Sequence, residues 1–121
     1  MNDQPVQHRR VLLIVTRDPR TSGRVAEAIR FTAGVSAWQK VDMTLYFGGN
    51  AVQGFLAGEN RFIDEDNIVD FLPLITEHKQ EIYVECGHPV VAANRDLIPY
   101  PELDLNQLAA LCAVQDCVMR F

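Results

Sequence analysis

The chain has 121 residues, a formal net charge of −5 and 48% hydrophobic residues, a composition typical of a globular protein with one domain. The acidic balance argues against a nucleic-acid-binding protein, which typically presents a basic face, and no apolar run approaches the about 20 residues of a membrane-spanning helix. The polar start MNDQPVQHRR lacks the hydrophobic region of a signal peptide, and the 3 cysteines form no disulfide pattern, so we expect a cytoplasmic protein with free thiols. We predict a flexible arm over residues 1–10 and a single domain over 11–121.

Strands are predicted wherever apolar residues run continuously or alternate. The aliphatic run Val11–Val15 is typical of a strand buried on both faces. Alternation predicts further strands over 41–47 and 81–85, and the chain closes on a strand over 117–121. The proline-rich segment 95–102 is least regular, and we predict a short fourth strand near Leu97-Ile98.

Helices are predicted between these strands. The first covers residues 23–38, with Thr21 or Ser22 as its cap, and a short helix follows over 51–56. Acidic residues 64–66 begin the next helix, where the helix dipole favours negative charge. Two more helices begin at Pro89 and at Asp104 or Asn106. Alternating strands and helices indicate an α/β fold, with a small, mostly parallel sheet flanked by helices.

Three loops of such a fold meet at one edge of the sheet, because a ligand crevice forms at the carboxyl ends of parallel strands. These loops cover residues 16–23, 48–52 and 86–89. Their candidate substrate-binding residues are Arg17, Gly49, Asn50, Gly87 and His88.

Cys86 is the candidate reactive residue of these loops. It lies between a predicted strand and a predicted helix, where the positive end of a helix dipole stabilises a thiolate. A protonated His88 would add positive charge, and Arg17, Arg20 or Arg24 could reach over from the first loop. The alternative is a buried thiol that acts as a small hydrophobic side chain.

The other two cysteines, Cys112 and Cys117, suit core packing. A zinc site with Cys86 and His88 lacks the paired short spacings of structural zinc sites, so no metal is expected. Gly48-Gly49-Asn50 lacks the pattern of a phosphate-binding loop and is better explained as a tight turn.

The order of these segments resembles the DsrE/TusD-like (DsrEFH-type) family of small sulfur-relay proteins, over nearly all of residues 11–121. The resemblance is carried by the segments VLLIVTRDP, RVAEAIRFTAG, MTLYFGGNAV, EIYVECGHPVVAANR and QLAALCAVQDCVMRF. It implies the family's three-layer sandwich, in which a parallel sheet lies between helices.

The resemblance also implies a function. Sulfur-carrying members hold persulfide sulfur on the cysteine that Cys86 matches, so this protein is expected to be a sulfur carrier or sulfurtransferase that needs no cofactor. It implies protein partners as sulfur donor and acceptor, and a homo-oligomer (trimer or hexamer) or a hetero-oligomer with related subunits. No nucleic acid or membrane partner is expected.

Two alternatives stay open at this point. The first is a non-catalytic oligomeric binding or scaffold protein with the same fold, whose crevice holds a small anion through arginines and helix N-termini. The second is a redox sensor in which Cys112 or Cys117 resolves an oxidised Cys86.

Overall fold

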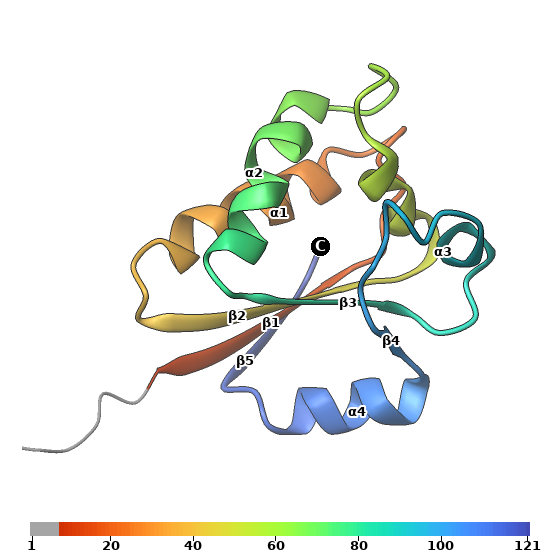
Figure 1. The fold of residues 1–121 in the computed structure, drawn as a ribbon. Coiled ribbons are helices and arrows are strands. Elements are labelled where there is room, and N and C mark those ends of the chain that lie inside the picture. Colours follow the sequence, from red (N-terminus) through yellow and green to blue (C-terminus); the bar gives the residue numbers. More distant parts are fainter. Residues whose placement is uncertain (1–7) are drawn as a thin grey trace, which may run out of the picture.

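The computed structural model describes residues 8–121, which form a five-stranded parallel sheet with helices on both faces (Figure 1). The α/β class predicted from the sequence is therefore confirmed. The strands are β1 (Arg9–Val15), β2 (Val41–Phe47), β3 (Glu81–Glu85), β4 (Glu102–Leu103) and β5 (Cys117–Arg120). The helices are α1 (Arg24–Ser36), the 3-10 helix η1 (Gly49–Leu56), α2 (Glu65–Glu77), α3 (Pro89–Ala93) and α4 (Leu105–Ala113).

The strand order is β4-β3-β2-β1-β5, and every neighbouring pair is parallel. The first strand therefore lies inside the sheet and explains the unbroken aliphatic run of Val11–Val15. Its residues Leu12, Leu13 and Val15 are fully buried. Because all strands are parallel, their carboxyl ends and the loops that follow them lie at the same edge of the sheet.

The two faces of the sheet are covered unequally. Helices α1 and α2 lie on one side and α4 on the other (Figure 1). The main core is on the α1 and α2 side, where alternate residues of β1 to β3 meet the apolar faces of the two helices. No residue of α4 is fully buried, and Leu105 at its start is 81% exposed. The fold is thus a three-layer arrangement with one well-packed side and one lightly covered side.

The helix starts follow the sequence signals in most cases. Asp104 caps α4 in a capping box: its carboxylate accepts from the Gln107 backbone N–H, and the Gln107 side chain accepts from the Asp104 N–H. The N-cap of α1 is Gly23, which provides no side-chain bond. The expected cap Ser22 still accepts from the Arg24 N–H at 3.2 Å, so it stabilises the first turn from one position earlier.

The prediction of a strand at Leu97-Ile98 is wrong. These two residues form a turn whose N–H groups donate to the Asn94 carbonyl, and Ile98 is fully buried in the core. The short strand β4 lies further along the chain, at Glu102–Leu103. The residue before it, Pro101, accepts a hydrogen bond from the Val84 N–H of β3. A buried isoleucine beside a turn gives the same sequence pattern as a short strand.

The predicted arm over residues 1–10 lies largely outside the described part of the chain. Of its last three residues, Arg9 and Arg10 already belong to β1. Within residues 8–121, every helix is too short or too polar to cross a membrane.

Candidate functional site

Cys86 is an exposed free thiol at the carboxyl end of β3. Its backbone N–H donates to the Leu103 carbonyl at 3.0 Å, which fixes the loop against β4. Gly87 has a φ of +76°, a left-handed conformation that favours glycine, and a side chain added there would meet no atom within 4 Å. The glycine therefore serves the backbone turn that presents the thiol to solvent.

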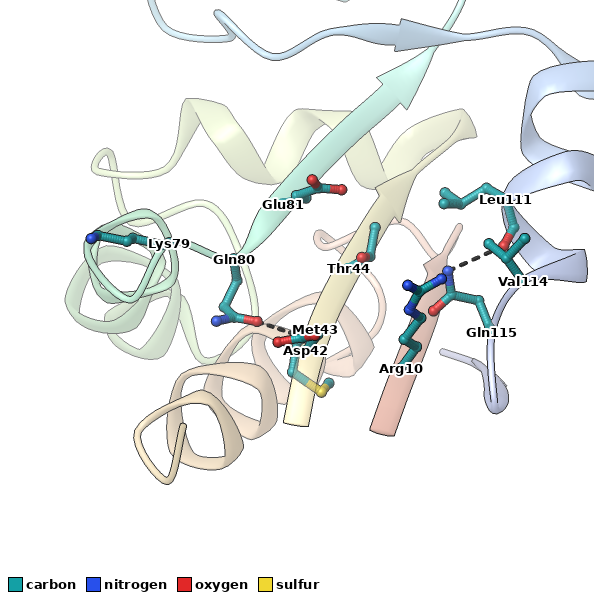
Figure 2. Close-up of a pocket in the computed structure, with 10 residues that line it drawn as sticks. All are labelled: Arg10, Asp42, Met43, Thr44, Lys79, Gln80, Glu81, Leu111, Val114 and Gln115. Carbon is teal, nitrogen blue, oxygen red and sulfur yellow. Dashed lines mark hydrogen bonds between the residues drawn. The ribbon is translucent and has the colours of Figure 1, made fainter. Parts of the chain in front are cut away.

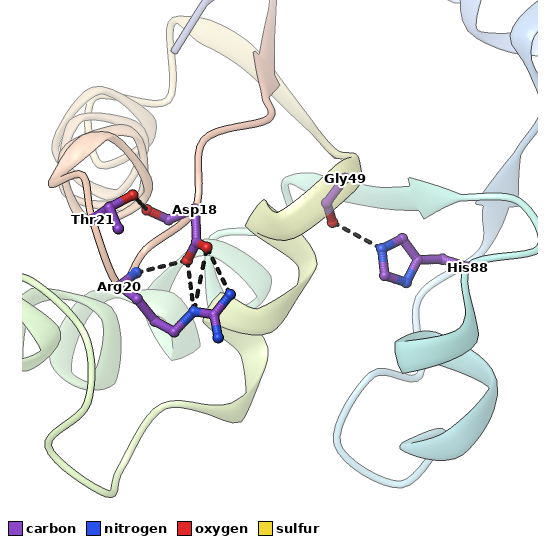
Figure 3. Close-up of polar contacts among 5 residues, drawn as sticks. All are labelled: Asp18, Arg20, Thr21, Gly49 and His88. Carbon is purple, nitrogen blue, oxygen red and sulfur yellow. Dashed lines mark hydrogen bonds and ion pairs between the residues drawn. The ribbon is translucent and has the colours of Figure 1, made fainter.

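His88 connects the Cys86 loop to the loop after β2 (Figure 3). Its Nε2–H donates to the Gly49 carbonyl at 2.9 Å, and its Nδ1 accepts from the Val90 N–H at 3.1 Å, so it is the N-cap of α3. Both ring nitrogens of His88 are engaged in hydrogen bonds to backbone atoms. The side chain therefore acts as a clamp between the two loops.

The charged groups that contact this loop are carboxylates. The Glu85 carboxylate accepts from the Gly49 N–H at 3.3 Å, and the Glu102 carboxylate accepts from the Gly87 N–H at 3.3 Å. Arg95 then pairs with Glu102 at 3.3 Å. The sequence analysis did not identify these residues. Glu85 could have been found from its position at the end of β3, whereas Glu102 depends on the short strand that the sequence pattern misplaced.

Tyr46 is a further buried residue of this site. Burial, followed by the negative charges of Glu85 and ionised Cys86, raises the pKa of the Tyr46 hydroxyl. Its side chain lies so close to Gly48 that a Cβ added there would be 3.1 Å from the ring. Gly48 thus makes room for the tyrosine at the end of its own strand. The sequence analysis did not identify Tyr46 as a residue of this site.

The arginines of the first loop do not contact Cys86 by a hydrogen bond or ion pair within residues 8–121. Arg20 pairs with Asp18 at 2.8 Å, and this guanidinium lowers the pKa of the Asp18 carboxyl (Figure 3). Arg17 lies instead in a groove with Arg24 and Arg120. The three predicted loops do meet at one edge, but His88 joins only the second and third of them.

The remaining predicted residues have simpler positions. Gly49 has a φ of +54° and Asn50 is exposed, both in the first turn of η1, which agrees with a tight turn at Gly48-Gly49-Asn50. Cys117 is exposed and Cys112 is half-buried, so the expectation of core packing is wrong for Cys117. In the described residues 8–121, no group of three or more His, Cys, Asp or Glu side chains is placed to hold a metal ion.

A separate cavity of about 450 Å³ lies at the opposite, amino-terminal edge of the sheet (Figure 2). It is bounded by the starts of β1, β2 and β3 and by the end of α4. Both signs of charge line it, including Arg10, Asp42 and Glu81, and it contains none of the residues predicted from the sequence. Its position shows that the exposed thiol is outside this cavity, on an open loop.

Comparison with known proteins supports the fold. The chain is similar to the crystal structure of the YchN protein from E. coli, with a TM-score of 0.70 over 93% of this chain and 99% of that chain. The chain therefore has a DsrE-like fold. Sequence identity to YchN is 18%, so the likeness concerns the fold alone. No model of a protein family matches the sequence, and neither does any curated protein.

Proposed function

We propose that this protein is a sulfur carrier that holds a persulfide on Cys86. The single observation that carries the proposal is the exposed free thiol on a glycine turn at the carboxyl end of β3. In a parallel α/β sheet this edge is where ligands bind, and the DsrE-like fold is consistent with the proposal. A carrier thiol must reach the thiols of two other proteins, which requires an open loop rather than a closed pocket.

The proposed transfer is a thiol–persulfide exchange. The Cys86 thiolate attacks the outer sulfur of a donor persulfide and forms a new S–S bond to it. The S–S bond of the donor breaks, its electron pair leaves on the donor thiolate, and the transferred sulfur keeps its proton. In the second step an acceptor thiolate attacks the outer sulfur, and Cys86 leaves as a thiolate. Neither step needs an oxidant, a metal or a cofactor.

The charges around the loop favour a particular kind of partner. Glu85 and Glu102 flank Cys86, and no arginine of the first loop contacts it. We therefore expect donor and acceptor proteins with a basic surface around their own thiol, since opposite charges align two reacting partners and speed their association. The proposal places the exchange in the cytoplasm, where thiols stay reduced.

The test uses three single variants: Cys86→Ser, Cys112→Ser and Cys117→Ser. Each is incubated with a low-molecular-weight persulfide and analysed by intact-protein mass spectrometry and peptide mapping. We expect one added sulfur on the wild type and on the Cys112→Ser and Cys117→Ser variants, and none on Cys86→Ser. Because Cys117 is also exposed, its variant is the decisive control for simple accessibility. Sulfur that maps to Cys117 instead would contradict the proposal.

A second candidate function is a non-catalytic binding subunit with the same fold. It is favoured by the fact that the N–H groups of Gly87 and Val90 already bond to protein acceptors, which leaves them unavailable to a bound sulfur. In this case the wild type takes up no sulfur, while Cys86→Ser keeps its oligomeric state and partner binding. The same labelling experiment therefore separates the two functions.

We also propose that the protein self-associates through its lightly covered face. Leu105 and Val114 at the two ends of α4 are 81% and 54% exposed, and Val118 on β5 is 44% exposed. Burying such apolar surface in an oligomer is favourable. Light scattering coupled to size-exclusion chromatography should give a mass of three or six chains, or of a mixed complex with related subunits. A monomer at all concentrations would overturn this part of the proposal.

A further inference from the structure

Two arginines from near the start of the chain and one from near its end line one groove of about 400 Å³. Arg17 follows β1, Arg24 begins α1, and Arg120 ends β5. Among residues 8–121, Phe121 is the one further residue that lines the groove. The groove lies at the same edge of the sheet as Cys86 but three strand spacings away, about 14 Å, because β2 and β1 separate β3 from β5.

Of the three arginines in this groove, only Arg24 forms an ion pair within residues 8–121. Arg24 is held by Glu27 at 3.3 Å, whereas Arg17 and Arg120 are exposed and form no ion pair within residues 8–121. Arg20, in the same loop as Arg17, is different because Asp18 neutralises it. A chain with a net charge of −5 therefore has a local concentration of positive charge. Like charges in one groove repel each other, so an anion bound between them is stabilising.

The groove also has an ordered wall. The Arg24 guanidinium lies over the Phe121 ring, 5.5 Å from its centroid, and that ring packs against Phe31 at 6.3 Å between centroids. Phe121 is further fixed by backbone bonds, because its N–H donates to Ile14 and its carbonyl accepts from Thr16. Stacking on an aromatic ring and pairing with Glu27 limit the orientations of Arg24. Less conformational freedom is then lost when it binds a ligand.

We propose that this groove is a binding site for a tetrahedral oxyanion, the phosphate or sulfate group of a small molecule. Guanidinium groups match the oxygen atoms of such anions with two parallel N–H donors each. Arg17 and Arg120 provide the free donors, and Arg24 provides the oriented one. The site does not depend on the proposed persulfide function, since Cys86 takes no part in it.

The experiment measures thermal unfolding and isothermal titration with inorganic phosphate, inorganic sulfate and phenyl phosphate at low ionic strength. Low salt is required because exposed charges are screened over about 10 Å at 0.1 M. The test variant is Arg17→Gln/Arg120→Gln. The matched control is Arg9→Gln/Lys40→Gln, which removes the same two charges at exposed positions near the amino-terminal ends of β1 and β2.

We expect saturable binding and a rise in melting temperature of about 3 °C at saturation, relative to sodium chloride of equal ionic strength. The test variant should bind about tenfold more weakly or not at all, and the control variant should bind like the wild type. Tighter binding of phenyl phosphate than of the two inorganic ions would indicate an organic phosphate that uses the Phe121 wall. Cys86→Ser should bind as the wild type does, which separates this site from the thiol chemistry.

Three results would overturn the inference. The first is an effect that equals that of sodium chloride and does not saturate, which is a general salt effect. The second is an equal loss of binding in the test and control variants, which is an effect of net charge. The third is full binding by the Arg17→Gln/Arg120→Gln variant, which places any anion elsewhere.

Discussion

Replacing His88 by alanine removes two hydrogen bonds that hold the candidate site together. One is the bond from Nε2–H to the Gly49 carbonyl at 2.9 Å, and the other is the cap on the Val90 N–H at 3.1 Å. Loss of an N-cap costs about 1 kcal/mol, and loss of a partly exposed hydrogen bond costs about 1 kcal/mol. We therefore expect His88→Ala to lower the free energy of unfolding by about 2 kcal/mol, or the melting temperature by about 8 °C.

The variant His88→Asn separates the two contributions. Asparagine is a favourable N-cap residue, but its side chain is too short to reach Gly49 on the neighbouring loop. It should therefore regain about 1 kcal/mol relative to the alanine variant, through the cap alone. His8→Ala is the control, because the His8–Asp42 pair is exposed and such pairs contribute little.

Urea unfolding followed by circular dichroism gives these free energies, and the alkylation rate of Cys86 gives the mobility of its loop. The rate should rise in His88→Ala, because the loop is no longer tied to Gly49. A loss below about 0.5 kcal/mol in His88→Ala would refute the clamp, as the smallest hydrogen-bond contribution alone reaches that value. Equal losses in the alanine and asparagine variants would refute the capping role.

Three further predictions concern the rest of the fold. Gly54→Ala should destabilise the folded protein by about 1–3 kcal/mol, because the added Cβ would be 2.8 Å from Val25 Cγ1. Gly34→Ala, in the exposed part of α1, should instead stabilise it by about 0.5–1 kcal/mol. Equal effects of the two variants in thermal melts would contradict this. Ile98→Ala should lower the free energy of urea unfolding by about 3 kcal/mol, and Leu97→Ala should leave it nearly unchanged. The reason is that the Ile98 side chain is 0% exposed and the Leu97 side chain is 60% exposed. The reverse order would mean that the turn is misplaced. Burial raises the pKa of Tyr100, so the folded state keeps the phenol proton at a pH where the unfolded state has lost it. The stability of the folded state should therefore fall as the pH rises above about 10. Tyr100→Phe should flatten this slope in unfolding experiments between about pH 8 and 11, and an unchanged slope would exclude Tyr100 as its source.

The central strands were predictable because their burial dictates their residue types. The segments 11–15, 41–47 and 81–85 were all predicted as strands, and the structure extends only the first, by two residues at its start. The run Val11–Val15 is apolar on both faces, as expected for a strand inside a parallel sheet, whereas β2 and β3 alternate because only one of their faces meets the main core. The Asp104 cap of α4 was predictable as well, because its partner Gln107 lies only three residues away.

The edge of the sheet was harder to predict. Strand β4 has two residues, and backbone N–H groups of Val84 and Cys86 donate to the Pro101 and Leu103 carbonyls beside it, so its pairing is not visible in its own short sequence. Ile98, which was predicted to belong to a strand, is apolar because it lies in a turn and its side chain is buried in the core. Cys117 was expected in the core, but β5 is an edge strand and leaves it exposed.

The meeting of the loops was predictable from the sequence, and the contacts within them were not. The rule for parallel sheets brought the correct loops to one edge, including Gly49 and His88, which do meet there. The hydrogen bond from His88 to Gly49 depends on how the loops after β2 and β3 pack together, and the position of Arg17 beside Arg120 depends on where β5 lies. Both are set by contacts between residues more than 30 positions apart, which the local sequence does not encode.

The placement of β5 beside β1 has a consequence for folding. The two strands pair Val11 with Cys117, and a hydrogen bond joins Arg10 to Asp116 across 106 positions. Closing so long a loop has a large entropic cost, so contacts of this kind tend to form late, after the nearer β1–β2 and β2–β3 pairs. Arg120 reaches its groove only when β5 has paired with β1. We therefore expect anion binding at that groove to report the completed sheet.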